Sequence, residues 1–362
     1  MSAANPRLRH ARVLVTGGCG FLGCNLADAL AQRGEDVLIL DNLSRAGTEE
    51  NAEWLKARHR KRIALEAADI RDFEAVKQCT HTARAVLHLA AQVAVTTSLD
   101  RPGEDLEINT RGTLNVLESV RLVNPRAPVI FASTNKVYGK LLGDDEVVLS
   151  GQRYAPLAPH LRSGVSERTP IDLYSPYGCS KGAADQYVRD YARVFGLRTV
   201  VLRMSCIYGP RQFGNEDQGW IAHFLLRAIR NSPINVYGTG YQVRDALYVD
   251  DAVAAWLGAL ERIDAISGRI FNLGGGATNA ISLRELIGLI AQLRGAELRL
   301  RFERWRPGDQ PWYVSDISAI SRALGWSPRT PLREGLRALE RWLDGRFAEA
   351  VPQPARLQEA RA

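Results

Sequence analysis

Two residues four positions apart, Tyr177 and Lys181, have side chains that could carry out acid–base chemistry together. If the segment is helical, residues at this spacing lie on one face, one turn apart. A free phenol loses its proton only near pH ~10, and a neighbouring ammonium group favours the phenolate and lowers that pKa. Tyr177 could then accept a proton from a substrate hydroxyl while a hydride leaves the same carbon for a nicotinamide. A lone pair of this kind is more often an ordinary helix surface, so the rest of the chain must decide.

A glycine-rich turn near the start of the sequence predicts a binding site for a dinucleotide. The apolar run 12–16 is typical of a strand, and leucines at helical spacing follow the turn. Glycines in such a strand–turn–helix unit let the backbone approach a pyrophosphate, which the free N–H groups of the helix N-terminus can bind. The predicted contacts are Gly17, Gly20, Phe21, Leu22 and Gly23.

The acidic residue that ends the next predicted strand, 36–40, indicates which dinucleotide binds. Asp41 lies close to the spacing of about twenty residues after the glycine turn at which an acidic side chain meets the adenosine ribose. Its carboxylate would accept hydrogen bonds from the ribose hydroxyls and repel a 2′-phosphate, so NAD is favoured over NADP. Arg45 is the counter-signal, since a guanidinium could bind that phosphate. We interpret it as a loop residue that is solvated or stacks on adenine.

Alternating strands and helices predict an α/β fold, a Rossmann-type doubly wound parallel sheet with a smaller C-terminal substrate lobe. Further strands are expected at 62–66, 85–89, 128–132 and 198–203. A dinucleotide binds at the carboxyl ends of such strands. Residues in the loops at these ends complete the predicted cofactor site: Asn42, Asp69, Ile70, Leu89, Ala90 and Gln92. His88, inside its strand, is interpreted as a core histidine rather than a catalytic residue.

Hydroxyl side chains follow the fifth predicted strand, which places them in the same crevice as Tyr177. Thr134 could share a proton with the reacting oxygen of the substrate. Next come Asn135 and Lys136, an amide and a cation, which cannot form the carboxyl acid–base pair that dehydration of a sugar needs. Segment 140–172 is polar, lacks periodicity and is too long for a simple connection, so we expect a lid or a subunit contact.

The composition disfavours several functional classes. With 46% hydrophobic and 24% charged residues, the chain is typical of a soluble globular protein. The net charge of +7 suits an anionic small molecule as well as nucleic acid, but no aromatic residues interleave with the densest basic cluster, 56–62, so no nucleic-acid partner is expected. The five cysteines form no C-x-x-C pair and do not cluster with the six histidines, so no metal site is predicted. No membrane-spanning run or apolar signal core occurs, and a cytoplasmic protein without membrane contact is expected.

Beyond the sixth predicted strand the pattern loosens, which predicts a second lobe that closes over the crevice. The expected division is a Rossmann domain at 8–203 that binds NAD and is rejoined by 240–262, a substrate-binding lobe at 204–239 and 263–345, and a frayed tail at 346–362. Loop arginines of the second lobe, Arg244 and Arg306, could hold a diphosphate with paired hydrogen bonds. Solvated loop arginines are an equally good interpretation at this point.

Taken together, these motifs resemble those of the extended short-chain dehydrogenase/reductases, the family of nucleotide-sugar epimerases and dehydratases. The resemblance covers about residues 12–343, and the stretches 133–139 and 242–245 add to the motifs described above. It implies that Thr134, Tyr177 and Lys181 form the catalytic set, that NAD stays bound, and that Lys181 also holds the nicotinamide ribose.

By position, the resemblance extends both binding sites. Asn109 would support Lys181 through water, and Ser133 and Ser205 would complete the cofactor contacts. The substrate would be a nucleotide diphosphate sugar, and its implied contacts are Gln92, Thr134, Asn135, Ser205, Gln218, Arg244 and Arg306. The resemblance also implies a homo-oligomer, a tetramer or a dimer.

Three functional classes remain. Within the family, the stretches 133–139, 175–187 and 211–220 are most similar to those of epimerases that invert carbon 2 of a CDP-linked deoxysugar. An epimerase acting on carbon 4 of UDP-glucose is the first alternative, and a 4,6-dehydratase is a weaker one. A non-catalytic regulator that binds NAD is disfavoured, because such a protein would not need all three residues of the catalytic set.

Overall fold

Seven parallel strands form the central sheet of the protein, in the computed structural model that describes residues 12–350 and side chains up to residue 346. The strands lie in the order β12-β8-β5-β4-β1-β2-β3. Their bounds are β1 (Arg12–Thr16), β2 (Val37–Asp41), β3 (Ile63–Ala67), β4 (Ala83–His88), β5 (Val129–Thr134), β8 (Thr199–Met204) and β12 (Arg269–Leu273). β1 and β4 are neighbours in the sheet, but the strands that follow them, β2 and β5, lie on opposite sides of this pair. The connections after β1 and β4 therefore run in opposite directions, which opens a crevice at the carboxyl ends of the two strands. The prediction of a Rossmann-type fold is confirmed.

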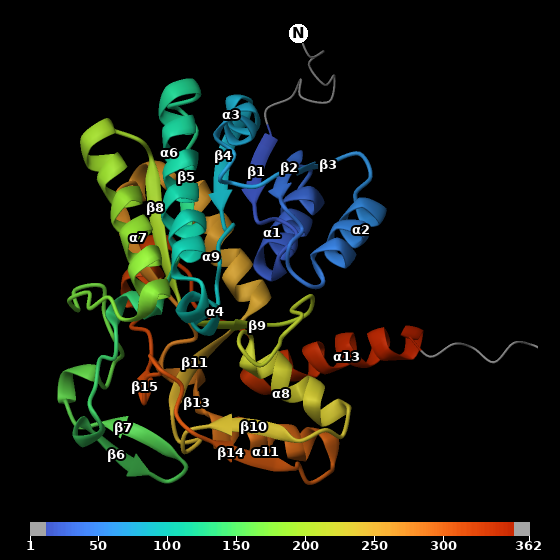
Figure 1. Cartoon of the computed structure of the whole chain (residues 1–362), viewed down its shortest axis with the longest axis vertical. Coiled ribbons are helices and arrows are strands. Elements are labelled where there is room, and N and C mark those ends of the chain that lie inside the picture. The colour runs from blue at the N-terminus through green and yellow to red at the C-terminus, as the bar shows by residue number, and fades with distance from the viewer. Residues whose placement is uncertain (1–11, 351–362) are drawn as a thin grey trace, which may run out of the picture.

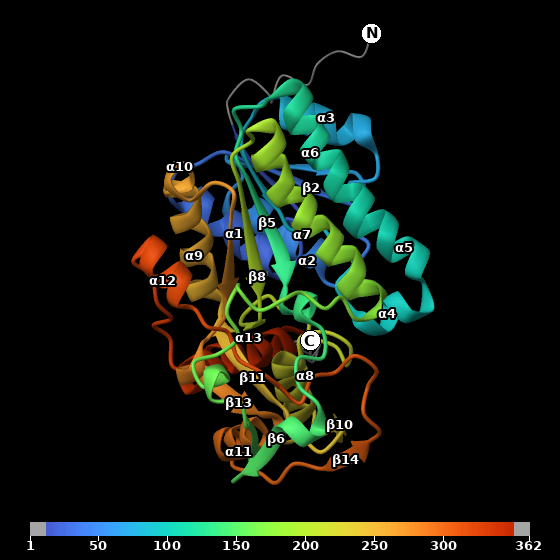
Figure 2. The same cartoon turned by 90° about the vertical axis from the view of Figure 1, so that its left-hand side faces the viewer.

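Helices cover both faces of this sheet, which explains why its inner strands are apolar without alternation. One face carries α1 (Phe21–Gln32), α2 (Thr48–Arg58) and α9 (Val249–Glu261), and the other carries α3 (Phe73–His81), α6 (Gly112–Val123) and α7 (Ser175–Phe195). In Figure 2, α9 and α7 lie on opposite sides of the strands β5 and β8. The turns α4 (Val95–Asp100) and α5 (Pro102–Leu106) and a π-helical turn (Glu107–Arg111) lead into α6.

A smaller lobe lies below the carboxyl ends of the strands in the view of Figure 1. Its sheets contain β9 (Cys206–Tyr208), β11 (Val243–Tyr248), β13 (Ala280–Ser282) and β15 (Trp312–Tyr313), with β10 (Ile234–Tyr237) paired to β14 (Leu300–Glu303). The helices that accompany them are α8 (Trp220–Ile229), α11 (Leu283–Arg294) and α13 (Leu332–Ala350), while α10 (Ile263–Ile266) and α12 (Ser318–Leu324) lie beside α9 and the main sheet. Only Ser205 separates β8 of the main sheet from β9 of the smaller lobe, so the chain crosses between the lobes beside the crevice.

The segment 263–345, expected in the substrate lobe, is divided between the two lobes. Its first strand, β12, pairs in parallel with β8 at the edge of the main sheet. The prediction was wrong for this strand because its partner lies far away in the sequence, and an isolated apolar run does not reveal which sheet it joins. Conversely, β11 belongs to the smaller lobe although 240–262 was expected to rejoin the Rossmann domain; only α9 does so.

Segment 140–172 has more structure than the expected lid or contact loop. It contains a hairpin of β6 (Val147–Ser150) and β7 (Arg153–Pro156) and short 3-10 turns at 144–146 and 159–161. The hairpin packs on the smaller lobe, where the N–H of Tyr154 donates to the carbonyl of Tyr241 at 2.9 Å.

The predicted frayed tail begins too early at residue 346. Arg346 is part of α13, and its guanidinium pairs with Glu50 at 2.8 Å. The predicted residues 8–11 and 351–362 lie outside the part of the chain that the structure describes.

Candidate active site

The first turn of α7 holds Tyr177 at the crevice. Two serine hydroxyls accept hydrogen bonds from N–H groups that have no partner within the helix: Ser98 binds Tyr177 at 3.1 Å and Ser175 binds Gly178 at 3.2 Å. Tyr177 and Lys181 are only 8% and 3% exposed and lie on the same wall of the crevice, together with Thr134 at the end of β5. The structure thus brings the three predicted catalytic residues together.

The ammonium group of Lys181 is buried against the main sheet. It donates to the carbonyl of Ala132 at 2.6 Å and lies 4.2 Å from the centre of the Phe131 ring. Burial lowers the pKa of Lys181 to about 7, although the carboxylates of Asp185 and Asp105 oppose that shift.

The pKa of Tyr177 differs from the expectation. Burial raises it to about 12, and a hydrogen bond from Thr134 only partly opposes this. The predicted lowering by Lys181 was wrong because burial outweighs it and the ammonium group is directed at the carbonyl of Ala132 instead. In this structure the phenol of Tyr177 is neutral at neutral pH and its oxygen is held by Thr134.

Asn109, in the π-helical turn before α6, connects the crevice to α7 next to Lys181. Its side-chain oxygen accepts from the N–H of Gln92 at 2.9 Å, and its amide donates to Ser180 at 3.0 Å and to Asp105 at 3.1 Å. The sequence reasoning missed Asp105, which also binds the Ser180 hydroxyl and the Gln92 amide. The spacing of Asp105 and Asn109, one helical turn, was the signal that could have identified it.

Ser133 faces a buried ion pair rather than open space. Its hydroxyl donates to Asp185 at 2.7 Å, and Arg203 binds both oxygens of the same carboxylate at 2.9 Å. Asp185 follows Lys181 by one helical turn, so its charge is held close to the ammonium group. Removing either partner of this pair would leave an uncompensated buried charge.

The glycine turn forms one end of a cleft that continues to the carboxyl ends of β2 and β4. A Cβ atom on Gly17 would lie 2.7 Å from the nitrogen of Ala90, and one on Gly23 would lie 2.2 Å from the carbonyl oxygen of Gly17, so both positions require glycine. The predicted cofactor contacts that line this cleft are Gly17, Gly20, Phe21, Leu22, Gly23, Asp41, Asn42, Arg45, Asp69, Ile70, Leu89, Ala90 and Gln92, with Ser133, Tyr177, Lys181 and Ser205 where it meets the catalytic residues. Asn109 stands behind this wall, bound to Gln92.

Asp41 sits at the end of β2 with its carboxylate fixed by the backbone. It accepts hydrogen bonds from the N–H groups of Cys19 and Leu43, both at 2.9 Å. Burial nevertheless raises its pKa. Arg45, expected to be solvated or stacked on a base, is exposed and donates to the side-chain oxygen of Gln218 at 2.9 Å. This bond links the cofactor cleft to the smaller lobe.

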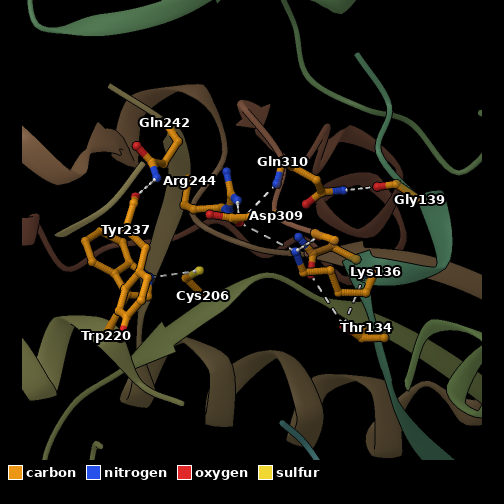
Figure 3. Close-up of polar contacts among 12 residues, drawn as sticks. Thr134, Lys136, Gly139, Cys206, Trp220, Tyr237, Gln242, Arg244, Asp309 and Gln310 are labelled. Carbon is orange, nitrogen blue, oxygen red and sulfur yellow. Dashed lines mark hydrogen bonds and ion pairs between the residues drawn. The ribbon is translucent and has the colours of Figure 1, made fainter. Parts of the chain in front are cut away.

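The crevice continues into a second pocket between the lobes, which we call the sugar pocket. Its wall on the main domain contains Thr134, Asn135, Lys136 and Tyr177. The smaller lobe contributes Cys206, Gln218, Trp220, His223, Tyr237, Gln242, Arg244, Arg306 and Asp309, several of which appear in Figure 3.

The two predicted arginines reach this pocket with partners of their own. Arg244 is 7% exposed and donates to Asp309 at 2.5 Å and to the carbonyl of Val243 at 2.7 Å. Arg306 donates to the carbonyl of Glu216 at 2.8 Å and stacks 3.8 Å from the centre of the Tyr237 ring. Neither is a solvated loop residue.

Gln92 and Ser205, expected to contact the substrate, line the cofactor cleft and not the sugar pocket. Gln92 is turned toward Asp105, and Ser205 donates to Asp245 at 2.5 Å. The sequence reasoning did not assign Cys206 to the pocket, and it included Trp220 and Asp309 only as ends of the candidate contact stretches 211–220 and 306–309. The QVRD stretch at 242–245 and the loop at 306–309 were recognised for their arginines, but which carboxylate pairs with which arginine depends on the fold.

Neither a metal centre nor a membrane helix is found in the described part of the chain. Residues 12–350 contain no group of three or more His, Cys, Asp or Glu side chains arranged to hold a metal ion. Within the same range, no helix is both long and apolar enough to cross a membrane.

Comparison with known proteins agrees with this geometry. The model of the NAD dependent epimerase/dehydratase family matches residues 13–274. The chain belongs to this family. Membership confirms the predictions of an enzyme and of NAD as its cofactor, and the glycine positions that leave no room for a Cβ atom fit a dinucleotide backbone.

Individual relatives cover nearly the whole chain. A CDP-paratose 2-epimerase of Salmonella typhi is 41% identical over 338 residues, which are 91% of this chain and 98% of the relative. A putative UDP-glucose 4-epimerase of Methanocaldococcus jannaschii is 32% identical over 91% of this chain and 98% of its own length. The structure of a Thermus thermophilus UDP-glucose 4-epimerase in complex with NAD superposes with a TM-score of 0.77 at 32% identity, covering 92% of this chain and 99% of that one.

Proposed function

We propose that this enzyme is a nucleotide-sugar epimerase that inverts carbon 2 of CDP-paratose, giving CDP-tyvelose. The observation that carries this proposal is the 41% identity to a CDP-paratose 2-epimerase over almost the full length of both chains. The convergence of Thr134, Tyr177 and Lys181 where the cofactor cleft meets the sugar pocket supports the same reaction class.

The reaction removes a hydride from carbon 2 and a proton from its hydroxyl, which leaves a ketone. NAD, when bound, supplies the hydride acceptor and a positive charge beside the reacting carbon. With NAD bound, the positive charges of the nicotinamide and of protonated Lys181 would lower the pKa of Tyr177, so that its phenolate can accept the hydroxyl proton while Thr134 holds both the phenolate and the sugar oxygen. Lys181, whose pKa is lowered to about 7, stabilises the Tyr177 phenolate in its protonated form, and the negative charge of the phenolate disappears when it takes the proton. The second half of the reaction is the reverse on the opposite face of the ketone, and Tyr177 returns the proton to oxygen.

For the ketone to present its opposite face, the sugar must turn while the nucleotide stays bound. Arg244, in β11, and Arg306, in the loop between β14 and β15, are the residues we assign to the diphosphate. Gln218 lies where both cavities meet and is tied to Arg45, so the smaller lobe stays anchored to the cofactor cleft during this turn.

A 4,6-dehydratase is disfavoured by the chemistry of the pocket wall. Dehydration needs one group to protonate the leaving hydroxyl and another to remove the proton beside the ketone. Asn135 and Lys136 stand directly after Thr134, and the half-buried carboxylate of Asp309 is paired with Arg244. An epimerase acting on carbon 4 of UDP-glucose needs the same catalytic set and is the second candidate, favoured by the fold match to a 4-epimerase.

We also infer a homo-oligomer in the cytoplasm. Apolar side chains on the outer faces of α6 and α7 are unusually exposed: Leu122, Tyr187, Val194 and Phe195 range from 44% to 62% exposed. All five cysteines are free, which fits a reducing compartment. Light scattering on the purified protein should give a dimer or tetramer, and Val194→Glu should shift it toward the monomer.

The experiment that tests the proposed reaction is product analysis by NMR. Purified enzyme should convert CDP-paratose to an equilibrium mixture with CDP-tyvelose and should leave UDP-glucose unchanged. Inversion at carbon 4 of UDP-glucose without any reaction at carbon 2 would establish the second candidate instead. Formation of a 4-keto-6-deoxy sugar from a nucleotide-linked glucose would contradict the exclusion of a dehydratase.

A further inference from the structure

Lys136 is a cation in the sugar pocket to which neither the catalytic steps nor the two arginines assign a function. It lies in a 3-10 turn (Asn135–Tyr138) directly after Thr134, and its backbone N–H donates to the Thr134 hydroxyl at 3.2 Å. Its side chain is 19% exposed and points into the pocket toward Asp309, as Figure 3 shows. Burial lowers the pKa of Lys136 to about 8. Such a residue is costly to bury unless a partner compensates it.

The partners of Lys136 within the chain leave room for an anion. Its ammonium group donates to the carbonyl of Gly308 at 3.0 Å and lies 3.8 Å from Asp309. The same oxygen of Asp309 is bound by Arg244 at 2.5 Å, so one carboxylate faces two cations. An ammonium group has three donors, of which the carbonyl of Gly308 uses one. This corner of the pocket therefore carries an excess positive charge and spare donors.

The chemistry of inversion at carbon 2 places a phosphate in this corner. In a nucleotide sugar, only carbon 1 and the bridging oxygen separate carbon 2 from the nearer phosphate, whereas carbon 4 lies on the far side of the ring. When carbon 2 reacts at Tyr177, the phosphate bound to the sugar must lie close to Tyr177 as well. Lys136 is two residues from Thr134, and Thr134 holds the phenol. A reaction at carbon 4 would carry that phosphate away from the catalytic set.

We propose that Lys136 binds the sugar-linked phosphate of the substrate and thereby selects carbon 2 as the reacting position. This rests on the proposed reaction at carbon 2. Arg244 is fixed by Asp309 on the neighbouring side of the same corner and contacts the phosphate from the smaller lobe. The two cations hold the sugar-linked phosphate close to Tyr177. The sugar ring can then turn over about its bonds to this phosphate with little displacement of carbon 2. Lys136 itself exchanges no proton with the substrate in this scheme.

The test compares ligands that differ by one group at a time. Binding of CMP, CDP and CDP-paratose to the enzyme with its NAD bound is measured by calorimetry for the wild type, Lys136→Met and Lys136→Gln. Loss of a charge-assisted hydrogen bond should weaken CDP by about ten- to a hundredfold. CMP lacks the sugar-linked phosphate and should bind almost as before. Lys140→Met, an exposed lysine in the following segment, removes the same charge and should change none of these affinities.

Each other outcome overturns the proposal in a recognisable way. Equal weakening of CMP and CDP would show that Lys136 only fixes the 306–309 loop through Gly308. Weakening of CDP-paratose alone would show that it binds a sugar hydroxyl. The Gln variant retains a donor for Gly308 without the charge, so it keeps the test usable if the Met variant does not fold. If the wild type fails to invert carbon 2 although Lys136→Met loses affinity for CDP, the phosphate contact stands, but both the proposed reaction and the selection of carbon 2 fail.

Discussion

The cofactor cleft and the sugar pocket meet at Tyr177, yet they are built in different ways. Loops at the ends of β1, β2 and β4, neighbours in one sheet, form much of the cleft, and residues from other segments, such as Arg101 and Gln218, complete its wall. The sugar pocket is assembled from the end of β5, the first turn of α7 and several segments of the smaller lobe that lie far apart in the sequence. Its charged side chains, Lys136, Arg244 and Asp309, are held by one another.

Because they are built differently, the two regions determine different properties: the cleft determines which cofactor binds, and the pocket determines which substrate reacts. Glycines that leave no room for a Cβ atom and one fixed carboxylate, Asp41, suffice to accept a dinucleotide, whatever the substrate is. Which carbon of the sugar meets Tyr177 depends on how ion pairs between the lobes hold the diphosphate. Variants of the cleft should therefore change cofactor binding, and variants of the pocket should change the choice of substrate.

The largest expected effect lies at the junction of the two regions. Tyr177→Phe keeps the packing of the ring and removes the proton acceptor, so the rate should fall by ~10²–10⁴-fold. The NAD content of the purified protein should hardly change, because the glycine turn and Asp41 are untouched. Steady-state kinetics and the absorbance of released cofactor measure both. A fully active variant would end the assignment of Tyr177 as the base.

Lys181→Met should impair both regions at once. It removes the ammonium group that supports Tyr177 and that we expect to bind the nicotinamide ribose. A hydrogen bond to a charged group contributes ~1.5–3 kcal/mol, so NAD affinity should fall by about tenfold or more together with the rate. Equilibrium dialysis with NAD separates this effect from the loss of rate. Unchanged NAD affinity would restrict Lys181 to a catalytic role.

A variant of Asp41 tests whether the cleft chooses its cofactor alone. Wild-type protein should release mainly NAD when it is denatured, because the carboxylate repels a 2′-phosphate. Asp41→Asn still accepts a hydrogen bond from Cys19 but loses that repulsion, so the preference for NAD should fall by about tenfold. Chromatography of the released nucleotides checks both. Mainly NADP from the wild type would show that Arg45 decides the preference.

The smallest effect concerns His88 at the end of β4. This residue is fully buried, and its ring nitrogens lie 2.7 Å from the Thr16 hydroxyl and 3.0 Å from the Thr113 hydroxyl. Burial lowers its pKa to about 3 from an ordinary value of 6.5. Below pH 6.5 the unfolded chain takes up a proton that the folded chain refuses, so stability from this site is lost as pH falls toward 3. Urea unfolding should show that the difference in free energy of unfolding between the wild type and His88→Gln becomes smaller as the pH falls across that range. A constant difference would mean that His88 is protonated in the fold.

The two regions also differ in how far the sequence predicts them. The bounds of β1 match the expected apolar run 12–16, and the spacing from Gly23 to Asp41 placed the carboxylate at the end of β2. These features depend on local pattern and on the geometry common to all parallel sheets. His88 was likewise predicted as a core residue because it stands inside a strand, and its burial confirms this.

The remaining features depend on contacts between distant segments. The pairing of β12 with β8, the docking of the 147–156 hairpin on the smaller lobe and the pairing of Arg244 with Asp309 leave no local pattern. The pKa of Tyr177 was predicted in the wrong direction for a related reason. The spacing to Lys181 was visible in the sequence, whereas the extent of burial and the direction of the ammonium group were not.

In the proposed reaction, a hydride leaves carbon 2 of the sugar and returns to carbon 2 of the same molecule. CDP-paratose carrying deuterium at carbon 2 is incubated with the enzyme in ordinary water, and the product is examined by NMR and mass spectrometry. We expect inversion at carbon 2 with the deuterium retained there, because the label is never exchanged with solvent. Loss of the label to water would contradict the redox mechanism, and retention of the label with inversion only at carbon 4 would contradict the position.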